Sequence, residues 1–157
     1  MPPIASRDEL TAARLAVLQQ ARYRLSIYQP MLTADIFSDT AEMTQLRRIA
    51  TAGRGAEIRI LLHDPQSVLR DGHRLVALAQ RLSSTVLVRV PTAEQDLGYG
   101  SAYMFDDVGG YVFQPEASRP QGRTALLDRG GQVPLIQHFN EVWERSERAS
   151  ALLPLGI

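Results

Sequence analysis

The sequence contains no cysteine and no lysine in its 157 residues. Without cysteine, the chain cannot form a disulfide, a thiolate nucleophile or a zinc–sulfur site. Without lysine, all 17 basic residues are arginine, so chemistry that needs a side-chain amine, such as Schiff-base formation, is excluded. No spacing of histidines and acidic residues fixes a metal geometry, and no nucleotide-binding loop is present. We therefore expect neither a metal nor a cofactor.

Long apolar runs and a net charge are also missing. No apolar stretch reaches the length of a membrane span, and the start, MPPIASRDEL, lacks the basic segment and apolar run of a signal peptide. Acidic and basic residues balance at 17 each, so no global field draws the chain to a membrane or to nucleic acid. We expect a cytoplasmic protein without a membrane partner, folded as a single domain over residues 1–157.

Apolar periodicity and turn residues divide the chain into alternating elements. Helices are predicted over about 6–21, 40–51, 71–82 and 132–147, and longer strands over 22–28, 56–64 and 85–91. Two short strands are predicted over about 101–106 and 110–114, with an exposed loop over 116–130. Helices that alternate with strands indicate parallel strands covered on both faces. The expected fold class is α/β, with a mixed, mostly parallel sheet flanked by helices.

The order of these elements resembles one half of the phospholipase D fold. Phe139 and Trp143, four residues apart on the last helix, are similar to the end of such halves. The segments GAEIRILLHDP, DGHRLVALAQRL and HFNEVWERSE look more closely like a bacterial phospholipase-D-like domain that often occurs beside an N-acetyltransferase domain. The resemblance covers about residues 7–148. It implies a phospholipase-D-like fold and an acetyltransferase domain or protein as a partner.

Enzymes of that superfamily carry a His-x-Lys-x-x-x-x-Asp motif, in which the His attacks phosphorus and the Lys holds phosphate oxygens. The resemblance places this motif on SAYMFDDVGGYVFQPE, residues 101–116. Counting back from Asp106 puts Tyr99 at the His position and Ser101 at the Lys position, whereas counting from Asp107 gives glycine and alanine. No histidine in the chain has the required spacing. The resemblance therefore implies the fold, argues against the family's chemistry and identifies no catalytic residue.

Asp106 and Asp107 are best interpreted as turn residues. Aspartate side chains bond nearby backbone groups, and Gly109 and Gly110 permit a positive φ in a hairpin turn. The alternative is that one of the two carboxylates survives from the acidic position of the family's site.

A second candidate site lies between a predicted strand and the following helix. His63 and Asp64 stand at the carboxyl end of the strand, where ligands gather in open α/β sheets. His73 and Arg74 open the helix, whose free N–H groups favour an anion. These four residues predict a site for a phosphate-containing ligand, with His73 as a proton shuttle. In the structural alternative, Asp64 and Asp71 cap a turn and the helix, and the histidines pack.

Four arginines are concentrated in one segment: Arg47, Arg48, Arg54 and Arg59. Such a cluster is able to hold nucleic acid phosphates. No aromatic residues interleave it and an acidic residue interrupts it, so a solvated face is the favoured interpretation and nucleic acid is not the expected partner.

We expect a catalytically degenerate phospholipase-D-like domain that acts as a binding or regulatory module associated with an acetyltransferase. One alternative is a phosphodiesterase or transferase that uses the His63, Asp64, His73 and Arg74 site. Another is a nucleic-acid-binding module that uses the arginine cluster.

A homodimer is also predicted, because two halves meet in the superfamily and only one half is present. Alternation along DLGYGSAYMF is expected to leave part of an apolar patch exposed, formed by Leu97, Tyr99, Tyr103 and Phe105.

Overall fold

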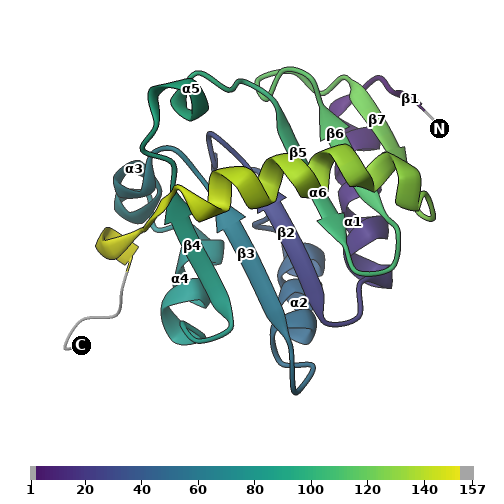
Figure 1. Cartoon of the computed structure of the whole chain (residues 1–157). Coiled ribbons are helices and arrows are strands. Elements are labelled where there is room, and N and C mark those ends of the chain that lie inside the picture. The colour runs from purple at the N-terminus through teal and green to yellow at the C-terminus, as the bar shows by residue number, and fades with distance from the viewer. Residues whose placement is uncertain (1–2, 153–157) are drawn as a thin grey trace.

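A computed structural model of the chain describes residues 3–152 and shows an eight-stranded sheet between two layers of helices (Figure 1). The helices are α1 (Arg7–Gln20), α2 (Thr40–Ala50), α3 (Pro65–Arg70), α4 (Arg74–Arg81), α5 (Glu94–Leu97) and α6 (Arg129–Glu144), with a 3-10 turn, η1, at Ser150–Leu152. The strands are β1 (Pro3–Ile4), β2 (Arg24–Tyr28), β3 (Glu57–Leu61), β4 (Val86–Val90), β5 (Ala102–Asp106), β6 (Tyr111–Gln114), β7 (Gly122–Ala125) and β8 (Glu147–Arg148).

The strand order across the sheet is β1-β7-β6-β5-β2-β3-β4-β8. The neighbours β2–β3 and β3–β4 are parallel, because a helical connection carries the chain back between them. The remaining pairs are antiparallel, and β5 returns beside β2. The predicted α/β class and mixed, helix-flanked sheet are confirmed, although parallel pairing is confined to these three strands rather than dominating the sheet.

Two cores fill the spaces on the two sides of the sheet. Helices α1, α2 and α4 lie behind the sheet in Figure 1, and α6 crosses in front of it. Alternation along β2 sends Leu25 and Ile27 into the aliphatic core under the three helices. Tyr28 enters a smaller, aromatic core under α6, together with Phe139 and Trp143. Both faces of the central strands are therefore buried.

The N-termini of the helices are capped by the side chains that the sequence offers. Ser6 accepts a hydrogen bond from the backbone N–H of Glu9 at 3.1 Å, as their spacing predicts for α1. Asp39 caps α2 and Asp128 caps α6 in the same way. These caps fix where the helices begin, and hence which residues they hold at the edge of the sheet.

The predicted helix over 71–82 is wrong in its limits. Pro65 stands at the start of a separate short helix, α3, where its missing N–H has no intrahelical partner to lose. Gly72, with a φ of 66°, interrupts the helical path. The second helix, α4, begins only at Arg74 and is capped by His73 rather than by Asp71.

The predicted exposed loop over 116–130 is also wrong in part. It contains β7, whose sequence GRTA lacks apolar alternation and joins the sheet through backbone pairing with β6. Its last residues form the first turn of α6, which carries Pro134 inside the helix. The short helix α5 lies in a segment with no periodic apolar pattern, and the sequence analysis missed it.

The exposed apolar patch predicted on β5 is not present at Tyr103 and Phe105. Their side chains are only 3% and 6% exposed, because α6 covers the face of β5 to which they point. Leu97 is 48% exposed and Tyr99 is half-buried. Within residues 3–152, no helix combines the length and apolar character needed to cross a membrane.

Candidate functional site at the carboxyl edge of the sheet

Tyrosine and histidine side chains meet where the central parallel strands end. Tyr28 is the last residue of β2, and His63 follows the end of β3. Tyr103 lies at the start of the neighbouring strand β5, which runs the other way, and Tyr99 lies in the segment just before it. His138 reaches the same place from α6. These five residues are called the tyrosine–histidine cluster below. Their position is the edge at which open α/β sheets hold ligands.

Each histidine of the cluster is hydrogen-bonded to a tyrosine hydroxyl. The Tyr28 hydroxyl lies 3.0 Å from Nε2 of His63, and the Tyr103 hydroxyl lies 2.8 Å from Nδ1 of His138. The tautomer of each ring decides which group donates. One nitrogen of each imidazole is therefore engaged within the protein.

The rings of the cluster pack against one another rather than around a space. The ring centroids of Tyr99 and His138 are 4.2 Å apart, and those of Tyr28 and Tyr99 are 5.0 Å apart in an edge-to-face arrangement. Tyr28 and Tyr103 are stacked at 5.4 Å. Such pairs add to the stability gained from burial alone. The cluster is thus a packed aromatic group at the end of the second core.

An ion pair closes the cluster on the side of α5. The carboxylate of Asp96, which is 3% exposed, accepts two hydrogen bonds of 2.7 Å from Nε and Nη2 of Arg145. This two-pronged geometry is the strongest form of the arginine–carboxylate contact. The backbone carbonyl of Asp96 also lies 3.4 Å from the Tyr28 hydroxyl. The positive charge of Arg145 is therefore balanced within the site.

The electrostatics of the site favour neutral tyrosines and neutral histidines. Burial raises the pKa of Tyr28 and Tyr103 well above the usual range, and a nearby Asp96 carboxylate adds to the effect at Tyr28. Burial lowers the pKa of His63 and His138. The hydrogen bonds from Arg145 lower the pKa of Asp96. Near neutral pH the cluster carries no charge besides the Asp96–Arg145 pair.

We expect the protein to lose stability as the pH falls from about 7 to about 5. Burial lowers the pKa of all three histidines below the value of about 6.5 found in an unfolded chain. In this window the unfolded chain binds more protons than the folded chain, so the free energy of unfolding must rise with pH.

Urea denaturation at a series of pH values measures this slope, and a His63→Gln/His138→Gln double variant should make it shallower. The double variant separates the contribution of the two histidines from that of Glu42. Burial raises the pKa of Glu42, so the titration of Glu42 changes stability with pH in the opposite direction. A slope that is unchanged by the double variant would contradict the assignment.

The four residues of the predicted anion site each make separate contacts in the structure. His63 belongs to the tyrosine–histidine cluster, whereas Asp64 caps α3 by accepting from the N–H of Ser67 at 3.1 Å. His73 is 6% exposed: its Nδ1 accepts from the N–H of Leu75, and its Nε2 lies 2.8 Å from the carbonyl oxygen of Ile36.

Arg74 donates to the carbonyl oxygen of Ser38 at 2.8 Å. These contacts engage both ring nitrogens of His73 and do not join the four residues to one another. Anion binding by His63, Asp64, His73 and Arg74 together stays a prediction.

Asp106 and Asp107 hold the backbone together at the opposite end of β5. One oxygen of Asp106 accepts the N–H groups of Val108, Gly109 and Gly110 at 2.8–2.9 Å. The two oxygens of Asp107 lie 2.9 and 3.3 Å from the backbone nitrogens of residues 22 and 23, just before β2. These contacts are those of turn residues.

The four arginines of the predicted cluster lie on different surfaces. Arg48 donates at 2.8 Å to carbonyl oxygens at the end of α1, and Arg54 is exposed in the loop before β3. Arg59 lies under α6, with its guanidinium 4.9 Å from the ring centroid of Phe139. Arg47 points toward α4. Proximity in sequence does not make them one patch.

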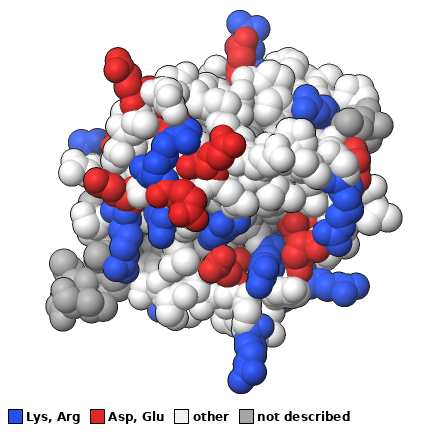
Figure 2. Space-filling model, in the orientation of Figure 1, with Lys and Arg blue, Asp and Glu red and all other residues white. Residues whose placement is uncertain are grey.

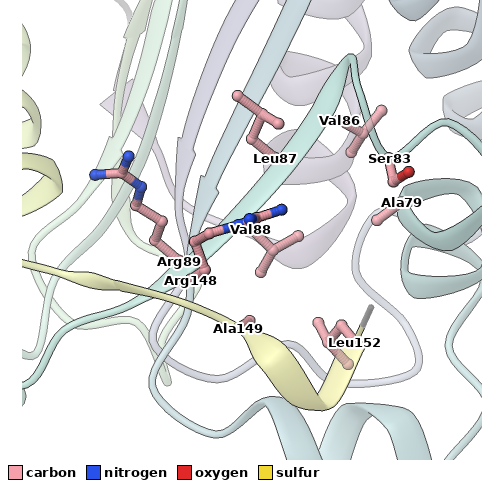
Figure 3. A pocket seen from close by; sticks show the side chains of 9 residues that line it. All are labelled: Ala79, Ser83, Val86, Leu87, Val88, Arg89, Arg148, Ala149 and Leu152. Carbon is pink, nitrogen blue, oxygen red and sulfur yellow. The ribbon is translucent and has the colours of Figure 1, made fainter. Parts of the chain in front are cut away.

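Hollows also lie outside the carboxyl edge. A polar groove of about 520 Å³ passes under the first half of α6, between Arg24, Arg59 and Arg129. A smaller hollow of about 150 Å³ lies where β4 meets the end of the chain, and Figure 3 shows its lining. There Arg148 extends over Val88, while the guanidinium of Arg89 points away and donates to the carbonyl oxygen of Trp143 at 2.8 Å.

Solved structures of two proteins share this architecture. Nuc, a phospholipase D family member from Salmonella typhimurium, matches with a TM-score of 0.52 and 11% identity, over 94% of this chain and 98% of Nuc. TrmBL2, an archaeal chromatin protein whose structure is described as showing a novel mode of DNA binding, matches with a TM-score of 0.66 and 13% identity. That match covers 94% of this chain, which spans about half (54%) of the TrmBL2 chain.

Because both identities are low, these matches define the fold alone: the protein has a phospholipase-D-like fold. The model of a family described as a domain of unknown function, DUF7931, matches residues 6–155, and the chain belongs to this family. No curated protein matches the sequence.

Within this fold, the positions that the resemblance gave to the nucleophile and the phosphate clamp are occupied by other contacts. Tyr99 packs on His138, and Ser101 donates its hydroxyl hydrogen to the carbonyl oxygen of Pro115 at 2.7 Å. His63 was expected at the carboxyl end of its strand, whereas no local pattern assigned a function to His138, Asp96 or Arg145. The order of strands could also have suggested Tyr28, since it ends the parallel strand β2.

Proposed function

We propose that this phospholipase-D-like domain is catalytically degenerate and acts as a binding or regulatory module that works with an acetyltransferase. The observation that carries the proposal is the set of side chains that fills the carboxyl edge of the sheet. A buried, hydrogen-bonded set of tyrosines and neutral histidines occupies it, and the adjoining cation, Arg145, is paired with Asp96. A phosphoryl-transfer site needs an available nucleophile and an unpaired positive charge for the phosphate oxygens.

Two exposed apolar residues lie close in sequence to members of the tyrosine–histidine cluster. Met31, three residues after Tyr28, is 69% exposed, and Leu97, two residues before Tyr99, is 48% exposed. Exposed apolar side chains that adjoin an aromatic group are typical of protein interfaces. Met31 and Leu97, with the half-buried ring of Tyr99, are called the edge surface below.

We propose that the edge surface contacts a second copy of the chain, which is the predicted homodimer, or the acetyltransferase partner that the family resemblance implies. A two-fold dimer uses the same patch on both subunits, so one small apolar surface is enough to cover both copies. This surface replaces Tyr103 and Phe105, which are buried, as the proposed contact.

A Leu97→Glu variant is expected to convert a dimer to a monomer, because a carboxylate would have to be buried in an apolar contact. Light scattering at micromolar concentration measures the mass directly. Leu126→Glu is the matched control, since Leu126 is also 48% exposed but lies before α6, away from the edge surface. A dimer that survives Leu97→Glu would refute the placement.

If the wild-type chain is a monomer, the acetyltransferase contact is tested instead. The domain is mixed with an N-acetyltransferase of the kind that the resemblance implies, and the co-elution of the two proteins is compared for the same two variants. Loss of co-elution with Leu97→Glu alone supports the edge surface, and equal behaviour of both variants counts against it.

A second candidate function is a phosphodiesterase or transferase that uses His63. It is favoured by one observation: the lowered pKa of His63 keeps its imidazole neutral near pH 7, which is the form required of a nucleophile or general base. The pairing of Arg145 with Asp96 is the argument against it, because the Arg145 guanidinium is then not free to hold the phosphate. Phosphodiester turnover separates the two functions.

A further inference from the structure

Three arginines from two neighbouring helices line one hollow on the side of the sheet opposite to α6. Arg47 lies in the last turn of α2, whereas Arg74 and Arg81 begin and end α4. The hollow has a volume of about 250 Å³, and its lining is completed by Met43, Ala77 and Leu78. Arg47, Arg74 and Arg81 are called the arginine triad below. None of them belongs to the carboxyl-edge site.

No carboxylate of these two helices opposes the arginine triad. Within α2 and α4, which the structure describes throughout, the single acidic residue is Glu42, which is 1% exposed and paired with Arg14. Among residues 3–152, no carboxylate lies within ion-pair distance of the triad. By contrast, acidic and basic side chains are mixed over the α6 side of the molecule, which Figure 2 shows.

The helix dipoles favour the positions of only two of the three arginines. Arg47 and Arg81 stand near helix C-termini, where a positive charge is favourable. Arg74 stands at the first position of α4, where the dipole disfavours a cation. Its Nη1 donates to the carbonyl oxygen of Ser38 at 2.8 Å, which ties the guanidinium to the loop that precedes α2. The other N–H groups of the guanidinium remain for a ligand.

The hollow suits a phosphate backbone better than a protein partner. Protein interfaces are centred on large aromatic or aliphatic anchors that become buried on binding. Here Met43 and Leu78 are already buried, at 2% and 3% exposed, and the exposed apolar residue between the arginines is the small Ala77. Guanidinium groups match phosphate oxygens in geometry and charge, and a small neighbouring side chain allows close approach.

We propose that the arginine triad is a binding site for the phosphate backbone of nucleic acid. Binding there is electrostatic and independent of base sequence, because the contacts reach phosphates rather than base edges. The arginine triad lies across the sheet from the tyrosine–histidine cluster, and binding there does not need the edge surface. A test of nucleic acid binding is therefore independent of the proposed module function.

The test is fluorescence anisotropy with a short labelled DNA duplex, measured over a series of potassium chloride concentrations. Each phosphate contact contributes about 0.9 to the slope of log affinity against log salt, so the triad predicts a slope of about −3. An Arg47→Gln/Arg81→Gln variant should bind on the order of tenfold more weakly at low salt and lose about 2 from the slope. An Arg47→Lys/Arg81→Lys variant, which keeps both charges, should retain most of the binding.

The matched control is Arg129→Gln/Arg148→Gln, which removes the same charge from two exposed arginines elsewhere on the chain. The proposal requires this control to bind like the wild type. It is overturned if the wild type does not bind the duplex at low salt, or if the control loses as much affinity as the triad variant. It is also overturned if labelled polyglutamate binds and the duplex does not, because the partner is then an acidic protein segment. Circular dichroism melts confirm that each variant is folded.

Discussion

Replacing Asp106 by alanine is expected to lower the free energy of unfolding by about 2–4 kcal/mol, because several buried donors would lose their acceptor. One oxygen of Asp106 accepts the backbone N–H groups of Val108, Gly109 and Gly110, and the other accepts from Nε2 of Gln20 at 2.7 Å. The residue is 5% exposed, so water can replace few of these bonds. Urea denaturation measures the loss.

Two variants serve as controls for this prediction. Asp107→Ala removes the acceptor of two N–H groups at a half-buried position and should cost about 1 kcal/mol. Asp106→Asn keeps the oxygen that caps the turn but turns a donor toward Gln20, so its loss should lie between those of the other two variants. A loss for Asp106→Ala no larger than that for Asp107→Ala would show that Asp106 does not anchor the turn.

The role of Asp106 bears on function because the resemblance places this residue at the acidic position of the phospholipase D motif. A carboxylate that is retained for folding needs no catalytic histidine or lysine beside it. Its three backbone contacts and its bond to Gln20 give it a structural role in the turn between β5 and β6. The presence of Asp106 is therefore not evidence for a surviving active site.

The central part of the fold could be predicted from local sequence signals. The capping residues Ser6 and Glu9 and the alternation of Leu25 and Ile27 define α1 and β2 through contacts within a few residues. Such local signals do not depend on where the element lies in the folded protein. By contrast, β7 has no apolar pattern, since its place depends on backbone pairing with β6.

The candidate site was predictable only in part for a related reason. Tyr28 and His63 follow two consecutive parallel strands, so topology alone brings them together. The contact between Tyr103 and His138 depends on β5 returning beside β2 and on the path of α6 across the sheet. Asp96 and Arg145 are 49 positions apart, and although Arg145 lies near the end of a predicted helix, Asp96 lies in a segment without a periodic signal. Such pairs follow from the completed fold rather than from any local pattern.

We expect the chain to have no phosphodiesterase activity of the phospholipase D type. In that chemistry a histidine nitrogen forms a bond to phosphorus as the alcohol leaves, and water then releases the phosphate. The resemblance places Tyr99 at the nucleophile position, and burial raises the pKa of Tyr99, which keeps its hydroxyl protonated near neutral pH. It places Ser101 at the lysine position, and the Ser101 hydroxyl is bonded to the carbonyl oxygen of Pro115. Neither residue supplies what the reaction needs.

The measurement that tests this account most directly is the turnover of bis-p-nitrophenyl phosphate by the wild-type chain and by a His63→Ala/His138→Ala double variant. The double variant removes both imidazoles of the tyrosine–histidine cluster, and urea denaturation checks that it is folded. A degenerate binding module predicts that both proteins release nitrophenol at the rate of buffer alone. Turnover by the wild type that the folded double variant loses would contradict the account and establish the carboxyl edge as an active site.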